Sequence, residues 1–180
     1  FPRFYFLSND ELLEILGQAK DPKAVQPFMR KCFEGINKMN LKAPGEDGRR
    51  DYEADAMIDP YGGEVVEFGD SVIIKGMVEV WMNAIEAMMI HSMRSQLKET
   101  WKQKKPILGW IRAWPGQLLI TASSVDWTNL VTKHLQQAKG GKKSATKKLK
   151  REFSKTLSRL IQLVQNPLKK VDRKKLIALI

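Results

Sequence analysis

The sequence predicts a mainly α fold: an elongated stack or bundle of long helices with one small antiparallel β-hairpin element. Apolar side chains recur at helical spacing along most of the chain, and one Gly/Pro-rich turn with β-branched flanks interrupts them. Hydrophobic residues make up 43% of the 180 residues, which suffices for a packed core. No apolar run reaches the roughly 20 residues of a membrane span. Because both ends are apolar and uncapped, we expect an excerpt of a larger polypeptide.

Residues 1–41 predict a strand followed by helices. The aromatic run at 1–6 favours a short buried strand, and Ser8 then suits the cap of an amphipathic helix. Asp21 and Pro22 are typical of a helix start, and the apolar spacing that follows predicts a second helix as far as Ile36.

Residues 42–75 predict a loop and a β-hairpin insert. The stretch 42–51 is polar and rich in turn formers, which is typical of an exposed loop. The turn at 59–63 separates strands expected at 56–58 and 65–68, and a third short strand is expected at 72–74.

Residues 76–138 predict a long helix and the helices that follow it. A single apolar stripe runs through 76–104, about 40 Å of helix, and carries Trp81 and Trp101 as expected core residues. A short helix is expected at 107–114. Ser123 and Ser124 are expected to cap the next helix rather than to act as nucleophiles.

Residues 139–148 predict a flexible Lys/Gly-rich loop, and residues 149–180 predict two C-terminal helices broken near Pro167. The positive charge is concentrated here. Residues 139–180 hold 14 Lys and Arg against 2 Asp and Glu, a net charge of +12, whereas residues 1–138 hold 17 against 18. The basic excess therefore belongs to the C-terminal quarter of the sequence and not to the whole chain.

The chain offers no constellation for chemistry, and we predict no catalytic, cofactor-binding or metal-binding residue in it. The stretch 140–144 lacks the upstream glycine and the Lys-Ser/Thr order of a phosphate-binding loop. The two histidines, His91 and His134, are far apart in sequence and have no obvious further ligands. Cys32 lies in an apolar helical pattern and is expected in the core.

Three features are candidates for contacts with a partner. Tyr61 lies at the tip of the predicted hairpin, and Trp110 and Trp114 are either core residues or interface anchors. The predicted helix at 147–165 places cations on the face opposite its apolar side: Lys148, Arg151, Lys155 and Arg159. This face is either simply solvated or binds an acidic surface. An alternative function is a basic helical adaptor that binds anionic membrane or nucleic acid through residues 139–175.

Several stretches together resemble the linker region of dynein heavy chains, which precedes the first AAA+ module in that family. The resemblance rests on these residues: Phe1–Leu16, Val25-Gln26-Pro27, Lys31–Ile36, Val78-Glu79, Trp81, Glu86, Pro115, Gln117, Trp127-Thr128, and the segments 157–165 and 173–180. The sequence at 7–11 with Gln26-Pro27 looks axonemal rather than cytoplasmic. The resemblance lapses in the loops at 42–51 and 139–148.

The resemblance implies a motor protein of the cytoskeleton in which this segment is a lever and not an enzyme. It implies that ATP and magnesium are bound in the AAA+ ring of the full-length motor, a microtubule ATPase of cilia and flagella. Expected partners are the AAA+ ring of the same heavy chain, intermediate and light chains, neighbouring heavy chains in the axoneme and, through the full-length protein, microtubules. No nucleic acid and no membrane are expected. The three candidate contact features then become candidate contacts with the ring.

Overall fold

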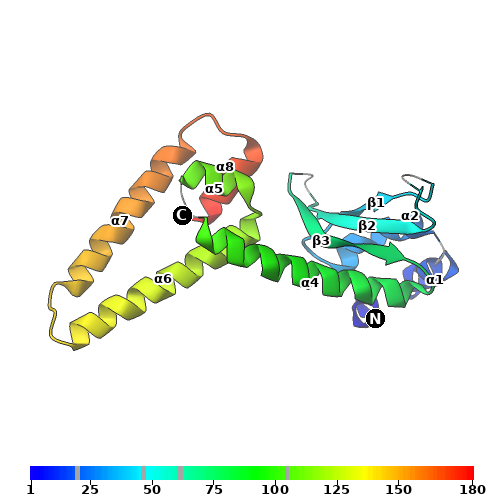
Figure 1. The fold of residues 1–180 in the computed structure, drawn as a ribbon, viewed down its shortest axis with the longest axis horizontal. Helices are drawn as coiled ribbons and strands as arrows, with labels where there is room; N and C mark the ends of the chain where they lie inside the picture. Colours follow the sequence, from blue (N-terminus) through cyan, green and yellow to red (C-terminus); the bar gives the residue numbers. More distant parts are fainter. Residues whose placement is uncertain (19–20, 46–47, 61–62, 104–105) are drawn as a thin grey trace. The chain divides into compact units, whose positions relative to one another are not determined.

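The computed structural model describes residues 1–18, 21–45, 48–60, 63–103 and 106–180. The chain divides into two compact units, residues 1–95 and 96–180, and each is described by itself. Helices dominate, and the described strands form one three-stranded antiparallel sheet (Figure 1). The predicted fold class, mainly α with a small antiparallel β element, is therefore confirmed. The finer division into five segments stays a prediction.

The first unit begins with a 3-10 helix, η1 (Pro2–Phe6), where we predicted a strand. A 3-10 turn places residues i and i+3 on the same side, which brings the Phe1 and Phe4 rings into an edge-to-face contact at 5.1 Å. Arg3 then reaches two other segments: its Nε donates to Glu86 Oε1 at 2.8 Å, and its Nη1 donates to the Cys32 carbonyl at 3.2 Å. The aromatic content of this segment favours a strand, but the Phe1–Phe4 ring contact and the two Arg3 hydrogen bonds form with the segment in a helical turn.

The next helix, α1 (Asn9–Gly17), starts as predicted. The Ser8 hydroxyl accepts a hydrogen bond from the Glu11 amide, and the Glu11 carboxylate accepts one from the Ser8 amide, so Ser8 and Glu11 form a capping box. A hydrogen bond from Lys31 to the Glu11 carboxylate is the main reason why the pKa of Glu11 falls to about 2.

The predicted second helix is three short pieces: α2 (Pro22–Val25), η2 (Gln26–Phe28) and α3 (Met29–Cys32). Asp21 caps α2 as expected, with its carboxylate accepting from the Lys23 amide at 2.9 Å. Pro27 has no N–H to donate, so the regular helix cannot continue through it. The helical segment also ends at Cys32, four residues earlier than predicted.

The sheet has the order β1-β2-β3, with strands β1 (Lys38–Lys42), β2 (Tyr52–Ile58) and β3 (Val65–Ile74). The predicted hairpin is confirmed, since Ile58 pairs with Val65, and the expected third strand at 72–74 is the end of β3. The Asp59 carboxylate closes the turn by accepting from the Gly63 amide at 2.7 Å. Strand β1 was not predicted; the Gln26 side chain holds it by bonding both the amide and the carbonyl of Met39.

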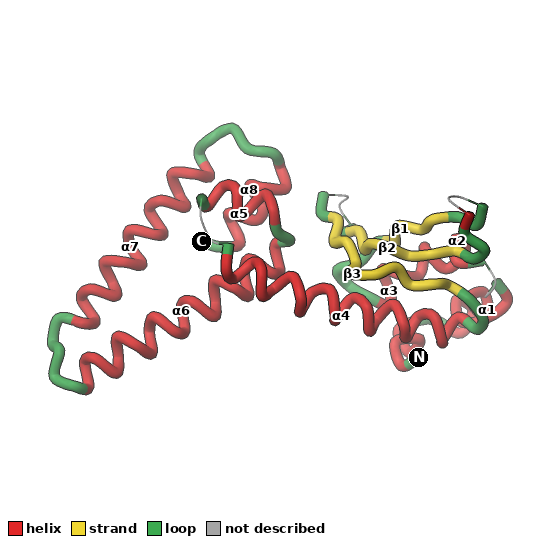
Figure 2. The backbone as a smooth tube through the Cα atoms, viewed as in Figure 1, coloured by secondary structure: helices red, strands yellow, loops and turns green. Residues whose placement is uncertain are grey.

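The core of the first unit joins the sheet to the helices beside it. In Figures 1 and 2 the sheet lies along α4 (Val78–Lys102), whose early turns supply large buried side chains to the same cluster as the strands. Its largest fully buried members on α4 are Trp81, Met82, Ile85 and Val78. The apolar stripe predicted for this helix is therefore the core-facing side for residues up to Met89.

Cys32 lies in this core, as predicted, and burial raises the pKa of its thiol to about 11. Because only the thiolate is nucleophilic, we expect Cys32 in the folded chain to react with a maleimide at pH 8 at least about 100-fold more slowly than in the chain unfolded in urea. Mass spectrometry of the labelled protein over time measures both rates. Equal rates would show that Cys32 is accessible and reactive.

The second unit contains the last turns of α4 and four further helices: α5 (Ile107–Ala113), α6 (Gly116–Lys139), α7 (Ala145–Val164) and α8 (Lys170–Ala178). Their core consists of Trp110, Ile111, Leu119, Ala122, Leu160 and Leu176. Two polar contacts fasten α8 to α5. Arg112 pairs with the largely buried Asp172 at 3.3 Å, and Lys175 Nζ donates to the Trp114 carbonyl at 2.9 Å.

Two predictions about helix boundaries in this unit are wrong. Ser123 and Ser124 lie inside α6 and do not cap a helix. The helix continues through this polar stretch because Leu119 and Ala122 are buried on its other side. The hydroxyls of Thr121 and Thr128 donate to carbonyls four residues back, so they are satisfied within the helix.

The turn between α6 and α7 is also shorter than the predicted loop at 139–148, because α7 already begins at Ala145. Ala145 is buried, and Gly141 has a φ of 92°, a left-handed conformation that glycine adopts without strain. Together these residues close a tight turn.

Candidate interaction surface

Helices α6 and α7 form a helical hairpin whose inner side is held by aromatic and polar contacts. The rings of Trp127 and Phe153 are stacked, with centroids 6.1 Å apart. Near the turn, the buried His134 places Nδ1 3.0 Å from the Ala145 carbonyl and Nε2 3.7 Å from the Glu152 carboxylate. Nδ1–H can donate to that carbonyl, so His134 can connect α6 to the first residue of α7.

Helix α7 carries the four cations that the sequence singled out. Lys148, Arg151, Lys155 and Arg159 recur every three or four residues, and all four are exposed. Among the described residues none of the four forms an ion pair. They therefore form a continuous basic face, with their charges available to an external acidic group.

The two tryptophans beside Pro115 have different environments. Trp110 is 8% exposed, and its indole N–H donates to the Thr100 carbonyl at 2.7 Å, which favours the core alternative for this residue. Trp114 is half-buried against the same core, and its indole nitrogen has no hydrogen-bond partner among the described residues. Trp114 thus retains some surface for a partner, whereas Trp110 has little. Tyr61 lies outside the described residues.

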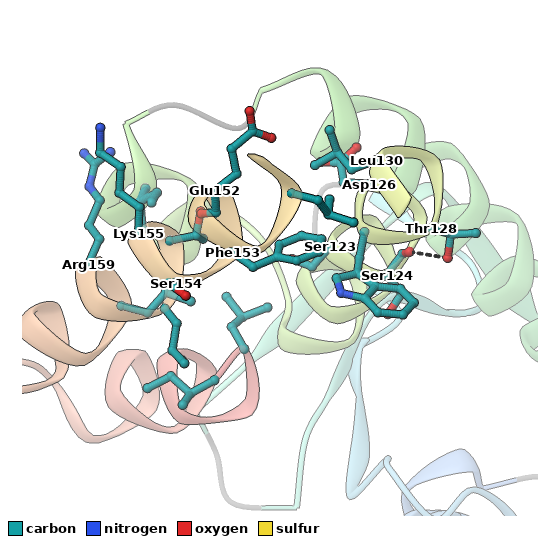
Figure 3. A pocket seen from close by; sticks show the side chains of 18 of the residues that line it. Ser123, Ser124, Asp126, Thr128, Leu130, Glu152, Phe153, Ser154, Lys155 and Arg159 are labelled. Carbon is teal, nitrogen blue, oxygen red and sulfur yellow. Dashed lines mark hydrogen bonds between the residues drawn. The ribbon is translucent and has the colours of Figure 1, made fainter. Parts of the chain in front are cut away.

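The structure also shows a groove that the sequence did not predict. A hollow of about 1340 Å³ opens between α6, α7 and α8 (Figure 3), lined by apolar side chains that include Ile120, Trp127, Leu130, Phe153, Leu157 and Leu179. Several of them are well exposed: Trp127 by 55% and Leu157 by 41%. The spacing of these residues predicts helices, but periodicity alone does not show that the two helices diverge.

Other kinds of site are not seen in the described part of the chain. It holds no cluster of three or more His, Cys, Asp or Glu side chains that could bind a metal ion. Within the same residues, no helix is both long enough and apolar enough to cross a bilayer. The candidate contact features are the basic face of α7, the half-buried Trp114 and the apolar groove.

The family model of the dynein heavy chain, N-terminal region 2, matches residues 1–100. The chain therefore belongs to the dynein heavy chain family, as its sequence motifs predicted. It is 41% identical to the Dynein-1-beta heavy chain, flagellar inner arm I1 complex, of Chlamydomonas reinhardtii. It is 38% identical both to Dynein axonemal heavy chain 2 and to Dynein axonemal heavy chain 6 of Homo sapiens.

Each alignment covers all of this chain, but the chain spans only 4% or 5% of the length of these relatives. The chain therefore corresponds to a small part of these heavy chains, and its residues 1–100 correspond to their N-terminal region 2. The relatives are flagellar and axonemal proteins by name, which supports the predicted location in the axoneme of the cytoskeleton.

Proposed function

We propose that residues 1–180 are part of a mechanical linker that transmits conformational change from an AAA+ ring to movement along microtubules. In this proposal the ring binds ATP and magnesium and hydrolyses the ATP, while the linker segment carries no catalysis. The observation that supports it most is the match to the dynein heavy chain N-terminal region over residues 1–100. The absence of a catalytic constellation in the sequence is consistent with this role.

The packing of both units suits a part that must transmit force. In the first unit, Trp81, Met82 and Ile85 are fully or almost fully buried along one side of α4, so bending there would expose apolar area. In the second unit, Arg112–Asp172 and the bonds from Lys175 tie α8 to α5. Such cores deform little, because closely packed interiors have low compressibility.

A lever must also dock and release, and the basic face of α7 suits transient docking onto the ring of the same heavy chain. Exposed ion pairs contribute about 0.2–1 kcal/mol each, so three or four of them would hold a contact that a change of nucleotide state can break. A large apolar interface would be too stable to release in each cycle. Intermediate chains, light chains and neighbouring heavy chains are further proposed partners of the assembled motor.

The test is charge reversal of the basic face in the full-length heavy chain. We expect the triple variant Lys148→Glu, Arg151→Glu, Lys155→Glu to weaken docking by about 1–3 kcal/mol, so that gliding slows several-fold while ATP turnover continues. Microtubule gliding speed and ATPase rate, measured on the same preparation, give the coupling ratio.

The matched control keeps the charges: Lys148→Arg, Arg151→Lys and Lys155→Arg should leave both rates near wild type. If the reversed variant glides and hydrolyses ATP normally, the basic face is not a docking site. The family match argues against the alternative of a free-standing adaptor for membrane or nucleic acid.

A further inference from the structure

The groove between α6, α7 and α8 exposes apolar side chains that an isolated helical unit would normally bury. Trp127 and Phe153 stack on one another at its floor, yet Trp127 and Leu157 keep 55% and 41% of their surface exposed. Exposed apolar side chains gathered in one hollow are typical of a binding site, whereas scattered ones are not. An occupant with an apolar face would therefore be stabilised there.

The size of the groove favours a polypeptide as the occupant. Its volume of about 1340 Å³ exceeds the range of roughly 300–1,000 Å³ that is usual for sites of small ligands. The lining residues run from Ile120 to Leu130 on α6 and from Thr146 to Leu160 on α7, and at 1.5 Å per residue the groove has the length of about three turns of a helix. Helix-in-groove binding uses apolar anchors at i, i+3, i+4 and i+7.

The charges beside the groove determine the chemistry of the occupant's polar face. Two carboxylates line it: Asp126 accepts from the Trp101 indole N–H at 2.7 Å, and Glu152 lies 3.7 Å from His134 Nε2. Lys150, Lys155 and Arg159 also line it, and none of them forms an ion pair within the described residues.

Lys155 and Arg159 lie apart from the apolar side chains at the floor of the groove. Figure 3 shows Lys155 and Arg159 extending away from Phe153, so they form a margin and are not part of the floor. The three cations outnumber the two carboxylates, so the net side-chain charge around the groove is positive, and the complementary occupant carries carboxylates outside its apolar face.

We infer that this groove is a docking surface for an amphipathic, acidic helix of a partner polypeptide. The apolar face of that helix would contact Trp127, Phe153 and Leu157, and its carboxylates would pair with Lys150 and Arg159. This inference goes beyond the lever role, because it assigns a partner to the apolar groove itself and not only to the basic face of α7.

The test uses the 180-residue chain and two synthetic helices of about 18 residues with leucines at i, i+3, i+4 and i+7. One carries glutamates at the other positions and the second carries lysines. We expect the glutamate helix to bind at least 10-fold more tightly than the lysine helix, as measured by isothermal titration calorimetry. The double variant Lys150→Glu, Arg159→Glu should reverse this preference, and its far-UV circular dichroism should match wild type.

A second variant tests the floor. Trp127→Ala should lower affinity for the glutamate helix at least 10-fold, whereas Leu135→Ala, which removes an exposed side chain of α6 outside the groove, should leave it unchanged. Equal binding of the two helices, or no binding of either, would overturn the inference. So would self-association of the chain through the groove, seen by sedimentation, or groove-dependent binding to phosphatidylserine vesicles, since each assigns the groove to another occupant.

Discussion

Replacing Trp81 by alanine should lower the free energy of unfolding of the first unit by about 3–5 kcal/mol. Trp81 is 2% exposed and lies among the largest fully buried side chains of its core, so truncation leaves a cavity that the sheet and α4 cannot readily fill. Urea denaturation of the 180-residue chain, followed by circular dichroism, measures the change.

The environment of the Trp81 indole nitrogen predicts a much smaller loss of stability for phenylalanine than for alanine at this position. It is buried and has no hydrogen-bond partner among the described residues, so Trp81→Phe removes an unpaired polar atom and should cost much less, about 1 kcal/mol. Val80→Ala is the control, because Val80 is a neighbouring residue of α4 that is exposed. A loss below 1 kcal/mol for Trp81→Ala would show that α4 does not pack on the sheet as described.

Replacing Trp110 by alanine should destabilise the second unit by a similar amount, about 3–5 kcal/mol. Trp110 is buried against Ile111 and Leu119, and it also donates a hydrogen bond to the carbonyl of the fully buried Thr100. Trp110→Phe keeps most of the volume but leaves that carbonyl without its donor, which should cost about 1–3 kcal/mol. We therefore expect the phenylalanine variant to cost more at Trp110, where it removes a hydrogen bond, than at Trp81, where it removes an unpaired polar atom.

The same urea titration measures these variants, with the exposed Leu135→Ala as the control. If Trp110 were an interface anchor, Trp110→Ala would leave the stability of the chain unchanged and would weaken only the binding of a partner. That result would restore Trp110 as a candidate contact residue.

Local signals in the sequence predicted the features that depend on a few neighbouring residues. Ser8 with Glu11, and Asp21 with Pro22, mark helix starts through bonds that form within one turn. The hairpin was predictable because Asp59 closes its own turn. Trp81 was predicted as a core residue because its spacing from Ile85 matches the helical period.

Features that depend on distant residues could not be predicted in this way. Strand β1 is fixed by Gln26, thirteen residues before Met39. Trp101 shares the spacing of Trp81 and was predicted in the core, yet it is 45% exposed and bonds Asp126 on another helix. These outcomes depend on where a second element lies, and periodicity does not contain that information.

The same distinction applies to the candidate contact surface: some of its features follow from local sequence, and others depend on distant residues. The basic face of α7 follows from helical spacing alone, so the exposure of Lys148, Arg151, Lys155 and Arg159 was predictable. The choice between core and interface for Trp110 required the position of Thr100. The groove required knowing that α6 and α7 diverge, because its residues have the spacing of an ordinary helix contact.

The most direct test of the lever role is a distance measurement in the full-length heavy chain. A fluorophore at Gln136→Cys, an exposed position on α6, would be paired with a second fluorophore on the first AAA+ module. We predict that the efficiency of energy transfer between them changes between the nucleotide-free and ATP-bound states of the ring. An efficiency that stays constant through the ATPase cycle would contradict the proposal that this segment moves as a lever.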